Sequence, residues 1–436
     1  MPRRVAVTGV GVVSPTGIGV EAFWEALMTA RRGIGEIIAF DAHKFPCRIG
    51  AELADFSARG YVPKSYRKSV KVMARDIEIA VAAADLAFRD AGIVTRGIEE
   101  GKENVEAKRL GCNIGAGLIC VDLDELGAAV NTALTDGRFD IRKWGSGGMS
   151  NLTPLWLLKY LPNMLSCHVT IIHGAEGPSN TITCCDASAH MAVGEATRMI
   201  ARDAADVIVA GGAESKLNPM GLLRQGLLGR LCTEGNDRPA DACRPFDAAH
   251  SGTVIGEGGG LLVLEDYDRA KQRGARIYAE LIGFGAACDP AGMDITTATA
   301  GGLDLAAAKA IADAGIAPEQ VDLIVAHGTA VPAEDQRECA AWQAALGSDA
   351  TSKPAVSITG GTGSLYAGAG GAELATAALA LHHQVIPPTV NFTAREDRCG
   401  LGMSDQPREH EINYVITGAF SIGGQSAACV LKRAEA

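Results

Sequence analysis

Two adjacent cysteines, Cys184 and Cys185, lie in the run Thr183-Cys184-Cys185-Asp186-Ala187-Ser188. A short apolar approach precedes them, and a helix is expected roughly from residue 187 to residue 201. A cysteine at a strand-to-helix turn lies where unpaired backbone N–H groups and the helix dipole favour an anion. Because the thiolate is the nucleophilic form of cysteine, this turn would suit a nucleophile. A buried structural cysteine fits the same apolar surroundings, so the turn by itself leaves both interpretations open.

Three glycine-rich turns in the second half of the chain could join this chemistry. The first is Ala326-His327-Gly328-Thr329-Ala330, at the end of an expected strand. The second, residues 359–364, precedes a helix of small residues, and the third, residues 418–424, follows a strand at 414–416. Ligands gather at the carboxyl ends of strands in α/β sheets, which favours a functional His327 over a core or capping histidine. None of the three fits GxGxxG with a following acidic residue, so a dinucleotide site is weakly supported.

The composition indicates a large α/β protein. The chain has 436 residues with 53 glycines, 47% hydrophobic and 21% charged, which allows two or three domains. A net charge of −11 argues against nucleic-acid binding. No apolar run reaches the roughly 18 residues of a membrane span, and the N-terminus lacks the features of a signal peptide. The twelve cysteines form no CxxC and the nine histidines no HExxH, so we expect a reduced, cytoplasmic protein without a metal site.

The expected elements contain a repeat. The Ala-rich helix at 303–316 (LDLAAAKAIADAGI) resembles the one at 80–93 (AVAAADLAFRDAGI), and each leads through a linker to a strand that ends at small polar residues. This pattern predicts an internally duplicated α/β fold. We also expect strands at 5–13, 110–117 and 207–210, of which the last ends in Gly211-Gly212. A loop is expected at 216–252. Residues 121–165 look like an excursion from the core.

Nearly the whole chain resembles the β-ketoacyl-acyl-carrier-protein synthases, the condensing enzymes of the thiolase fold. The resemblance is carried by VAVTGVGVVSPTG, GPSNTITCC, ADVIVAGGAE, RPFD, GEGGGLLVLEDYDRAKQRGARIYAELIGFG, AHGTAVPAED and FSIGGQSA. It implies a duplicated, five-layered αβαβα fold with halves of roughly 1–268 and 269–436, and a cap at 118–165. It also implies a homodimer whose sheet continues across the interface near the nucleophile.

The resemblance implies a role for each candidate residue. Cys185 would take an acyl chain as a thioester from the phosphopantetheine of acyl carrier protein, with no bound cofactor or metal. The backbone N–H groups of Cys185 and Ile422 would form the oxyanion hole, next to Phe420 in the same glycine turn. His327 would promote loss of CO₂ from malonyl-carrier protein and stabilise the enolate. The remaining matches are Thr329 in the pantetheine tunnel and the acidic supporting residues Asp335 and Glu338.

Several positions depart from the family pattern. Ser364 stands where the family has its second catalytic histidine, and Thr359 where it has a lysine. Val331 replaces the second tunnel threonine, Ile422 the phenylalanine that gates the acyl pocket, and Asp186 a small uncharged residue after the nucleophile. Losing the imidazole and the lysine removes donors and positive charge, and Asp186 places a like charge beside the thiolate. Removing one such stabiliser typically costs about 10²–10³ in rate, so decarboxylation is expected to be impaired.

These departures leave three functions open. The first is an acyltransferase of the condensing type that works with Cys185 and His327 in fatty-acid or polyketide-type synthesis. The second is acyl transfer, or a modified condensation, without normal decarboxylation. The third is a non-catalytic subunit that pairs with a homologous synthase as a heterodimer and shapes its product chain, although such partners usually lose the cysteine. A thiolase is disfavoured, because a second catalytic cysteine is not found and Cys429 is better explained as a core residue.

Overall fold

Eleven strands form one mixed sheet within residues 2–291 and 301–435, which the computed structural model describes. Their order across the sheet is β13-β12-β16-β17-β11-β1-β10-β9-β5-β8, with the short β2 paired to β1. The strands of the first half are β1 (Val5–Ser14), β2 (Gly17–Ile18), β5 (Leu110–Gly115), β8 (Ser179–Ile182), β9 (Val207–Ser215) and β10 (Glu257–Asp266). Those of the second half are β11 (Ala279–Cys288), β12 (Leu323–Ala326), β13 (Ala355–Val356), β16 (Tyr414–Phe420) and β17 (Gln425–Arg433).

The two halves of this sheet have the same topology. In the first half β8, β5 and β9 are parallel, and β10 and β1 follow in antiparallel pairing. In the second half β13, β12 and β16 are parallel, and β17 and β11 follow in antiparallel pairing. A short antiparallel pairing of β1 with β11 joins the halves. The predicted duplication is therefore confirmed, and the repeated helices occupy equivalent places as α2 (Arg75–Asp90) and α9 (Gly301–Ala314).

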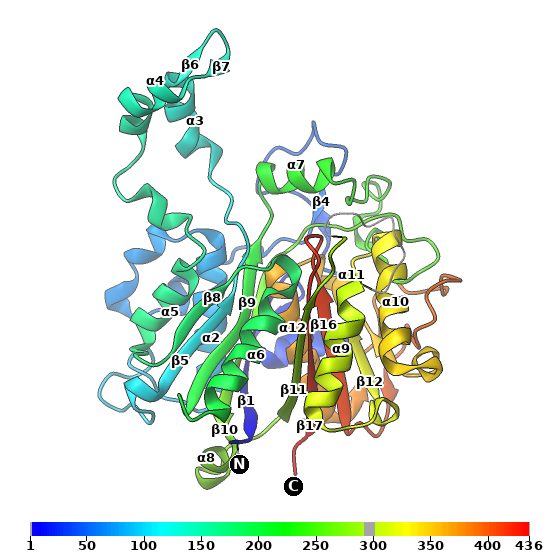
Figure 1. Cartoon of the computed structure of the whole chain (residues 1–436). Helices are drawn as coiled ribbons and strands as arrows, with labels where there is room; N and C mark the ends of the chain where they lie inside the picture. The colour runs from blue at the N-terminus through cyan, green and yellow to red at the C-terminus, as the bar shows by residue number, and fades with distance from the viewer. Residues whose placement is uncertain (1, 292–300, 436) are drawn as a thin grey trace.

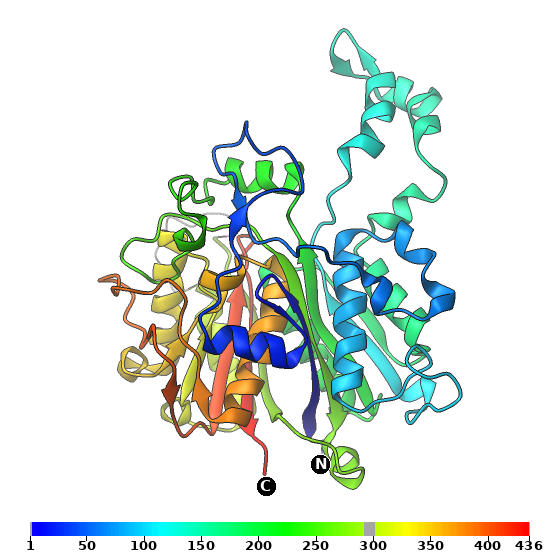
Figure 2. The same ribbon diagram turned by 180° about the vertical axis from the view of Figure 1, so that it is seen from behind.

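Helices complete the five layers (Figures 1 and 2). One outer layer holds α2 and α5 (Met164–His173), and the opposite outer layer holds α9 and α10 (Pro332–Leu346). Between the half-sheets lie α6 (Ser188–Ala201) and α12 (Ala369–His383), which pack against strands of both halves. Thirteen consecutive residues of α12, from 369 to 381, are buried, which explains why this helix consists largely of Gly and Ala. The predicted αβαβα architecture is confirmed.

Three further helices lie around this framework. They are α1 (Val20–Met28), α7 (Pro219–Leu227) and α8 (Tyr267–Gln272). The prediction of a loop throughout 216–252 was wrong, since α7 lies within it. The sequence carries a helix start there, because the side chain of Asn218 accepts a hydrogen bond from the Gly221 N–H and Pro219 occupies the first turn.

The strand predicted to end in Gly211-Gly212 continues through both glycines to Ser215 as β9. A Cβ at Gly212 would collide with the carbonyl oxygen of Ala367, and one at Gly211 with the carbonyl oxygen of Gly260. These glycines therefore allow neighbouring backbone to approach the strand and do not terminate it.

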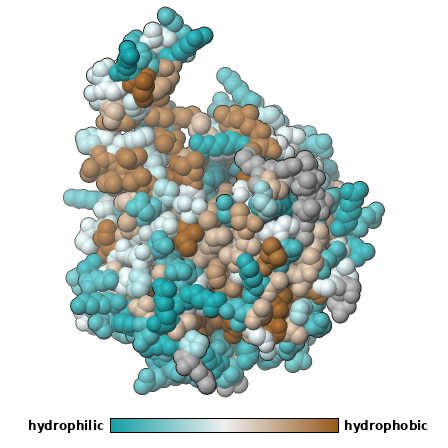
Figure 3. All heavy atoms as spheres, viewed as in Figure 1, coloured by the Kyte–Doolittle hydropathy of each residue, from teal (hydrophilic) through white to brown (hydrophobic). Residues whose placement is uncertain are grey.

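Residues 123–159 form an arm that projects from the body (Figures 1 and 2). It comprises α3 (Leu123–Thr132), β6 (Leu134–Thr135), β7 (Arg138–Phe139), α4 (Ile141–Ser146) and two 3₁₀ turns, η5 (Gly148–Asn151) and η6 (Trp156–Lys159). Figure 3 shows hydrophobic side chains gathered where the arm meets the body, and Leu155, Leu157 and Leu158 are exposed in this stretch. The excursion predicted here is present, and its role as a cap stays a prediction.

No helix among the described residues is long and apolar enough to cross a membrane. Those residues also contain no group of three or more His, Cys, Asp or Glu side chains that could hold a metal ion. Cys429 is fully buried in β17, as its interpretation as a core residue requires.

Candidate active site

Cys185 begins a 3₁₀ turn, η7 (Cys185–Ala187), that joins β8 to α6. Its φ is 51°, a left-handed conformation that costs a non-glycine residue free energy. The turn is held by Ser188, whose hydroxyl accepts a hydrogen bond from the Cys184 N–H (2.8 Å) and donates one to the Ala116 carbonyl (3.2 Å). Backbone strain of this kind clusters at active sites, which favours a functional Cys185 over a structural one.

His327 follows the last residue of β12 and is fixed through its backbone. Its N–H and that of Gly328 donate to the two carboxylate oxygens of Glu338, each at 2.8 Å. The Thr359 hydroxyl donates to the His327 carbonyl at 2.9 Å. Thr359 and Glu338, both predicted as supporting residues, therefore contact the backbone around His327 and hold it in place. Burial raises the pKa of Glu338 to about 7, although His327 and the hydrogen bond from the Gly328 N–H both act to lower this pKa.

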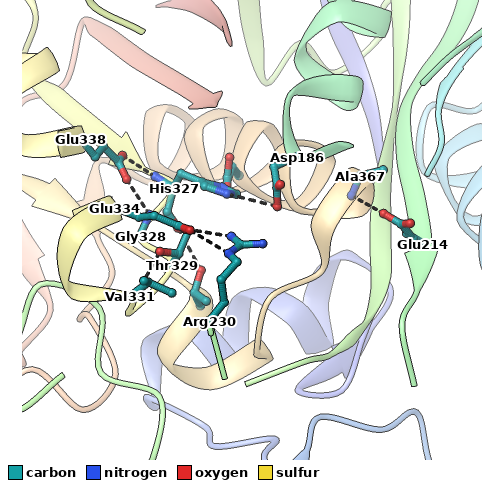
Figure 4. Close-up of polar contacts among 12 residues, drawn as sticks. Asp186, Glu214, Arg230, His327, Gly328, Thr329, Val331, Glu334, Glu338 and Ala367 are labelled. Atoms are coloured by element: carbon teal, nitrogen blue, oxygen red, sulfur yellow. Dashed lines mark hydrogen bonds and ion pairs between the residues drawn. The ribbon is translucent and has the colours of Figure 1, made fainter. Parts of the chain in front are cut away.

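The imidazole of His327 lies between two buried carboxylates (Figure 4). Its Nδ1 is 2.7 Å from Oε1 of Glu373 on α12, and its Nε2 is 3.5 Å from Oδ1 of Asp186 in η7. The Phe420 ring, predicted at the oxyanion hole, contacts the imidazole edge-on with ring centroids 6.0 Å apart. Three elements distant in sequence thus converge on one ring.

These neighbours set the charge of the ring. Burial opposes the imidazolium, but Glu373 and Asp186 outweigh burial and raise the pKa of His327 well above its ordinary value. For Asp186, burial also opposes the charged form, but His327 outweighs it and holds the carboxyl pKa at about 2. At neutral pH the structure therefore holds an imidazolium paired with the carboxylate of Asp186.

Cys185 is in a less favourable environment for ionisation. Burial raises the pKa of its thiol, and the carboxylates of Asp186 and Glu214 raise it further. The opposing influence of Lys216 and Arg230 is weaker. The like-charge effect expected of Asp186 is therefore present, and the resting cysteine is a thiol at neutral pH.

A second carboxylate shapes the turn after His327. Asp335 accepts backbone N–H groups from Thr329 and Ala330 through one oxygen, and the N–H of Phe246 through the other. The Thr329 hydroxyl accepts from the N–H of Val331, the cap residue of α10. The two predicted tunnel residues are thus adjacent and rigidly held.

The other predicted positions lie on segments around this centre. Ser364 is buried, and its backbone pairs with Val254 and Gly256. Ile422 is half-buried in the turn between β16 and β17, the two strands against which η7 packs. Within the described part of the chain, no side-chain hydrogen bond joins Ser364 to Cys185.

Several buried groups near Cys185 escaped the sequence analysis. Glu373 contacts His327, and Glu214 pairs with Lys216. Arg230 forms a bidentate pair with Glu334 at 2.7 and 2.8 Å (Figure 4). Tyr366 is fully buried and begins the 3₁₀ turn η11 (Tyr366–Gly368) before α12. The sequence contains one signal that could have drawn attention to Tyr366. It is the one large aromatic residue in the Gly/Ala-rich stretch 359–380.

Comparison with known proteins identifies the family. A model of the β-ketoacyl synthase N-terminal domain matches residues 2–270, and one of the C-terminal domain matches residues 278–393. The chain belongs to the β-ketoacyl synthase family. It is thus a member of the acyltransferase family of 3-oxoacyl-acyl-carrier-protein synthases, as the sequence motifs predicted.

Relatives in this family match over the full length. A 3-oxoacyl-(acyl-carrier-protein) synthase 2 of Vibrio harveyi is 36% identical over 99% of both chains. A putative β-ketoacyl synthase of actinorhodin polyketide synthesis from Streptomyces coelicolor is 33% identical, covering 100% of this chain and 90% of the relative.

Solved structures share the fold over the full length as well. The ishigamide ketosynthase/chain length factor matches with a TM-score of 0.82 at 27% identity, covering 100% of both chains. A type II polyketide ketosynthase in complex with its acyl-carrier protein matches with a TM-score of 0.84 at 25% identity, again over 100% of both chains. The chain is therefore a β-ketoacyl synthase family member of the fatty-acid or type II polyketide class.

Proposed function

We propose that this β-ketoacyl synthase takes an acyl chain from acyl carrier protein onto Cys185 and condenses it with malonyl-carrier protein. The observation that carries the proposal is the strained turn of Cys185 beside His327, with Asp186 of that turn in contact with the imidazole. The relatives named above are carrier-protein-dependent synthases, and one similar structure contains such a carrier protein. No bound cofactor is part of this proposal.

Acyl transfer must begin from a thiol. His327 is already protonated at neutral pH, so it is suited to donate a hydrogen bond or a proton and not to accept the proton of Cys185. As the Cys185 sulfur attacks the thioester carbonyl, a new C–S bond forms, the C–S bond to phosphopantetheine breaks, and the thiol proton passes to the leaving phosphopantetheine sulfur. Backbone N–H groups would stabilise the oxyanion formed on the way. The N–H groups of Cys185 and Ile422 are proposed for this role.

The condensation is expected to be slow in its decarboxylation step. Ser364 and Thr359 provide hydroxyl groups where the family resemblance implies an imidazole and an ammonium group. Thr359 is moreover engaged with the His327 carbonyl. Release of labelled CO₂ from malonyl-carrier protein measures this step directly, and a rate equal to that of ordinary family members would contradict impairment.

Intact-mass spectrometry tests the first step. The parent and a Cys185→Ala variant are mixed with acyl-carrier-protein thioesters of several chain lengths, with Cys184→Ala as the matched control. We expect an acyl adduct on the parent and the Cys184 variant and none on the Cys185 variant. An equal adduct on all three proteins would exclude Cys185 as the acceptor.

A second function has its own support. The departures at Ser364 and Thr359, together with the similarity to a ketosynthase/chain length factor, favour a non-catalytic partner subunit as the alternative. Such a subunit would form a heterodimer with a homologous synthase, whereas the first proposal includes a homodimer. This alternative would be supported by two results together. The isolated parent would form no acyl adduct, and an adduct would form only when a homologous synthase is present. A cytoplasmic location is proposed with either function, because all twelve cysteines are free.

A further inference from the structure

Tyr366 is the structural counterpart of Cys185 in the second half of the fold. In the first half, β8 leads to η7 and then to α6. In the second half, β13 leads through the one-turn helix α11 (Thr359–Thr362) to η11 and then to α12. Cys185 and Tyr366 each begin their 3₁₀ turn, each turn continues directly into its central helix, and the two φ angles are 51° and 50°. The duplicated fold therefore places two strained residues at equivalent positions.

The two turns pack together in the interior of the molecule. η11 packs against η7, and both adjoin the central helices α6 and α12. The Tyr366 turn is fixed by Glu214, whose Oε2 accepts the Ala367 N–H at 2.8 Å. The absence of a side chain at Gly212 lets the backbone of Ala367 approach β9. Tyr366 thus shares the strained backbone of Cys185 and is more deeply buried.

The hydroxyl group of Tyr366 is buried without a hydrogen-bond partner among the described residues. Both oxygens of Asp186 and Nε2 of His327 also lack a hydrogen bond there, apart from the 3.5 Å ion pair between them. Buried polar groups are normally hydrogen-bonded, so unpaired groups on and beside two turns that pack together, η7 and η11, indicate a site that binds a polar atom.

The phenol stays protonated in these surroundings. Burial raises the pKa of Tyr366 well above its ordinary value; Arg230 opposes this, and Asp186 and Cys185 add to it. The packing of η11 against η7 brings the phenol close to the turn that carries Cys185. A protonated phenol can donate a hydrogen bond.

We propose that the Tyr366 hydroxyl donates a hydrogen bond to the thioester oxygen of the malonyl group as it becomes an enolate oxygen, together with His327. This inference rests on the proposed condensation. It assigns to Tyr366 part of the stabilisation that Ser364 and Thr359 do not provide.

The step balances without a further reactant. The bond between the malonyl α-carbon and its carboxylate breaks, CO₂ leaves, and the electron pair moves into the enolate. The α-carbon then attacks the acyl carbon on Cys185, so a C–C bond forms, the C–S bond breaks and the sulfur leaves as a thiolate. Tyr366 keeps its proton throughout and stabilises the charge on the oxygen.

The test compares Tyr366→Phe with Tyr267→Phe. Tyr267 is a matched control, because it is also buried with an unpartnered hydroxyl but lies at the start of α8, near the N-terminus and away from the site (Figure 1). We expect Tyr366→Phe to load acyl groups on Cys185 like the parent while CO₂ release and condensation fall about 10²-fold. Tyr267→Phe should keep all three activities.

Other outcomes separate this inference from the proposed function. Condensation by Tyr366→Phe within about twofold of the parent would overturn the role of the hydroxyl. Equal loss of loading and condensation, with a lowered melting temperature, would assign Tyr366 to the fold and also overturn it. A parent that loads acyl groups but releases no CO₂ would overturn the inference and leave acyl transfer intact. A parent that does not load at all would refute the proposed function itself.

Discussion

Asp186 is the residue that most changes the chemistry of this site. It follows Cys185 directly, is 1% exposed and forms an ion pair with His327. The same carboxylate has opposite effects on its two neighbours, since it favours a charged imidazole and disfavours a charged thiol. The positive charge that His327 carries is therefore partly neutralised before any substrate binds.

We predict that Asp186→Asn makes Cys185 more reactive. Removing the carboxylate lowers the thiol pKa, so the thiolate fraction near neutral pH is expected to rise, about three- to tenfold. The alkylation rate of Cys185 by iodoacetamide, followed by peptide mass spectrometry, measures this change. Asp136→Asn, on the exposed arm, is the control and should leave the rate unchanged. A slower or unaltered alkylation of Cys185 in Asp186→Asn would contradict the assignment.

A second prediction concerns the pH dependence of stability. The pKa of His327 is higher in the folded than in the unfolded protein, so its contribution to stability is complete below the unfolded pKa of about 6.5. That contribution is lost as the pH rises through the folded pKa. We expect the free energy of unfolding of the parent to fall over this alkaline range more steeply than that of His327→Gln.

Urea unfolding measured at intervals between about pH 6 and pH 10 checks the prediction, since linkage relates its slope to bound protons. His190→Gln is the control, because burial lowers the pKa of His190 to about 3 and this residue stays neutral over that range. Parallel curves for the parent and His327→Gln would show that His327 is not held as an imidazolium.

The sequence was informative about single residues where their chemistry is local. The turns that carry Cys185 and His327 could be read from neighbouring residues, and the family resemblance then assigned a role to each residue. The contact of His327 with Asp186 and Glu373 could not be predicted from the sequence. It joins β12, η7 and α12, whose mutual placement depends on the packing of the two halves. Tyr366 escaped for the same reason, since only the duplicated topology places it opposite Cys185.

At the scale of elements, buried ion pairs fix the loops that surround the site. Arg230, after α7, is buried against Glu334 in the first turn of α10, and this α10 also carries Asp335 and Glu338, which hold the His327 turn. The Arg230–Glu334 pair thus ties a long loop to the helix that positions the imidazole.

We predict that Arg230→Met destabilises the fold by about 3–5 kcal/mol, because it leaves the Glu334 carboxylate buried and unpaired. Arg32→Met is the matched control, since the Arg32–Asp241 pair is largely exposed and its loss should cost no more than about 1 kcal/mol. The free energy of unfolding from urea titration at neutral pH distinguishes the two. Equal effects of both substitutions would show that the Arg230–Glu334 pair does not stabilise the loop.

Sequence patterns predicted elements better than their ends. The strands predicted at 5–13 and 110–117 and the repeated Ala-rich helices are present, but the helix α7 was missed. The strand β9 passes through Gly211-Gly212, which the sequence analysis took as its end. Glycine has two uses, in turns and in close backbone approach, and only the position of Ala367 shows which applies here. Local patterns carry no information about that neighbour.

At the scale of the whole molecule, the sheet ends at an open edge. Among the described strands β8 pairs with β5 on one side only, and it comes directly before the nucleophile turn. Exposed apolar side chains on the arm, such as Phe139, Ile141 and Leu155, add a hydrophobic surface to the same half of the molecule. Unpaired strand edges and large apolar surfaces are typical of association sites, which supports the proposed dimer.

The last prediction tests whether two copies pair through β8. The Pro178 carbonyl accepts a hydrogen bond from Cys112 of β5, and the Ile182 carbonyl accepts one from Ala116, the residue after β5. By strand alternation, the backbone groups of Ser179 and Thr181 therefore face the open edge. Ser179→Pro removes one outward N–H without disturbing the pairing with β5, and Ser179→Ala is its control. We expect light scattering after size exclusion to show a dimer for the parent and Ser179→Ala, and a shift towards monomer for Ser179→Pro at unchanged circular dichroism. A dimer of unaltered stability in Ser179→Pro would place the interface elsewhere, with the exposed arm as the next surface to examine.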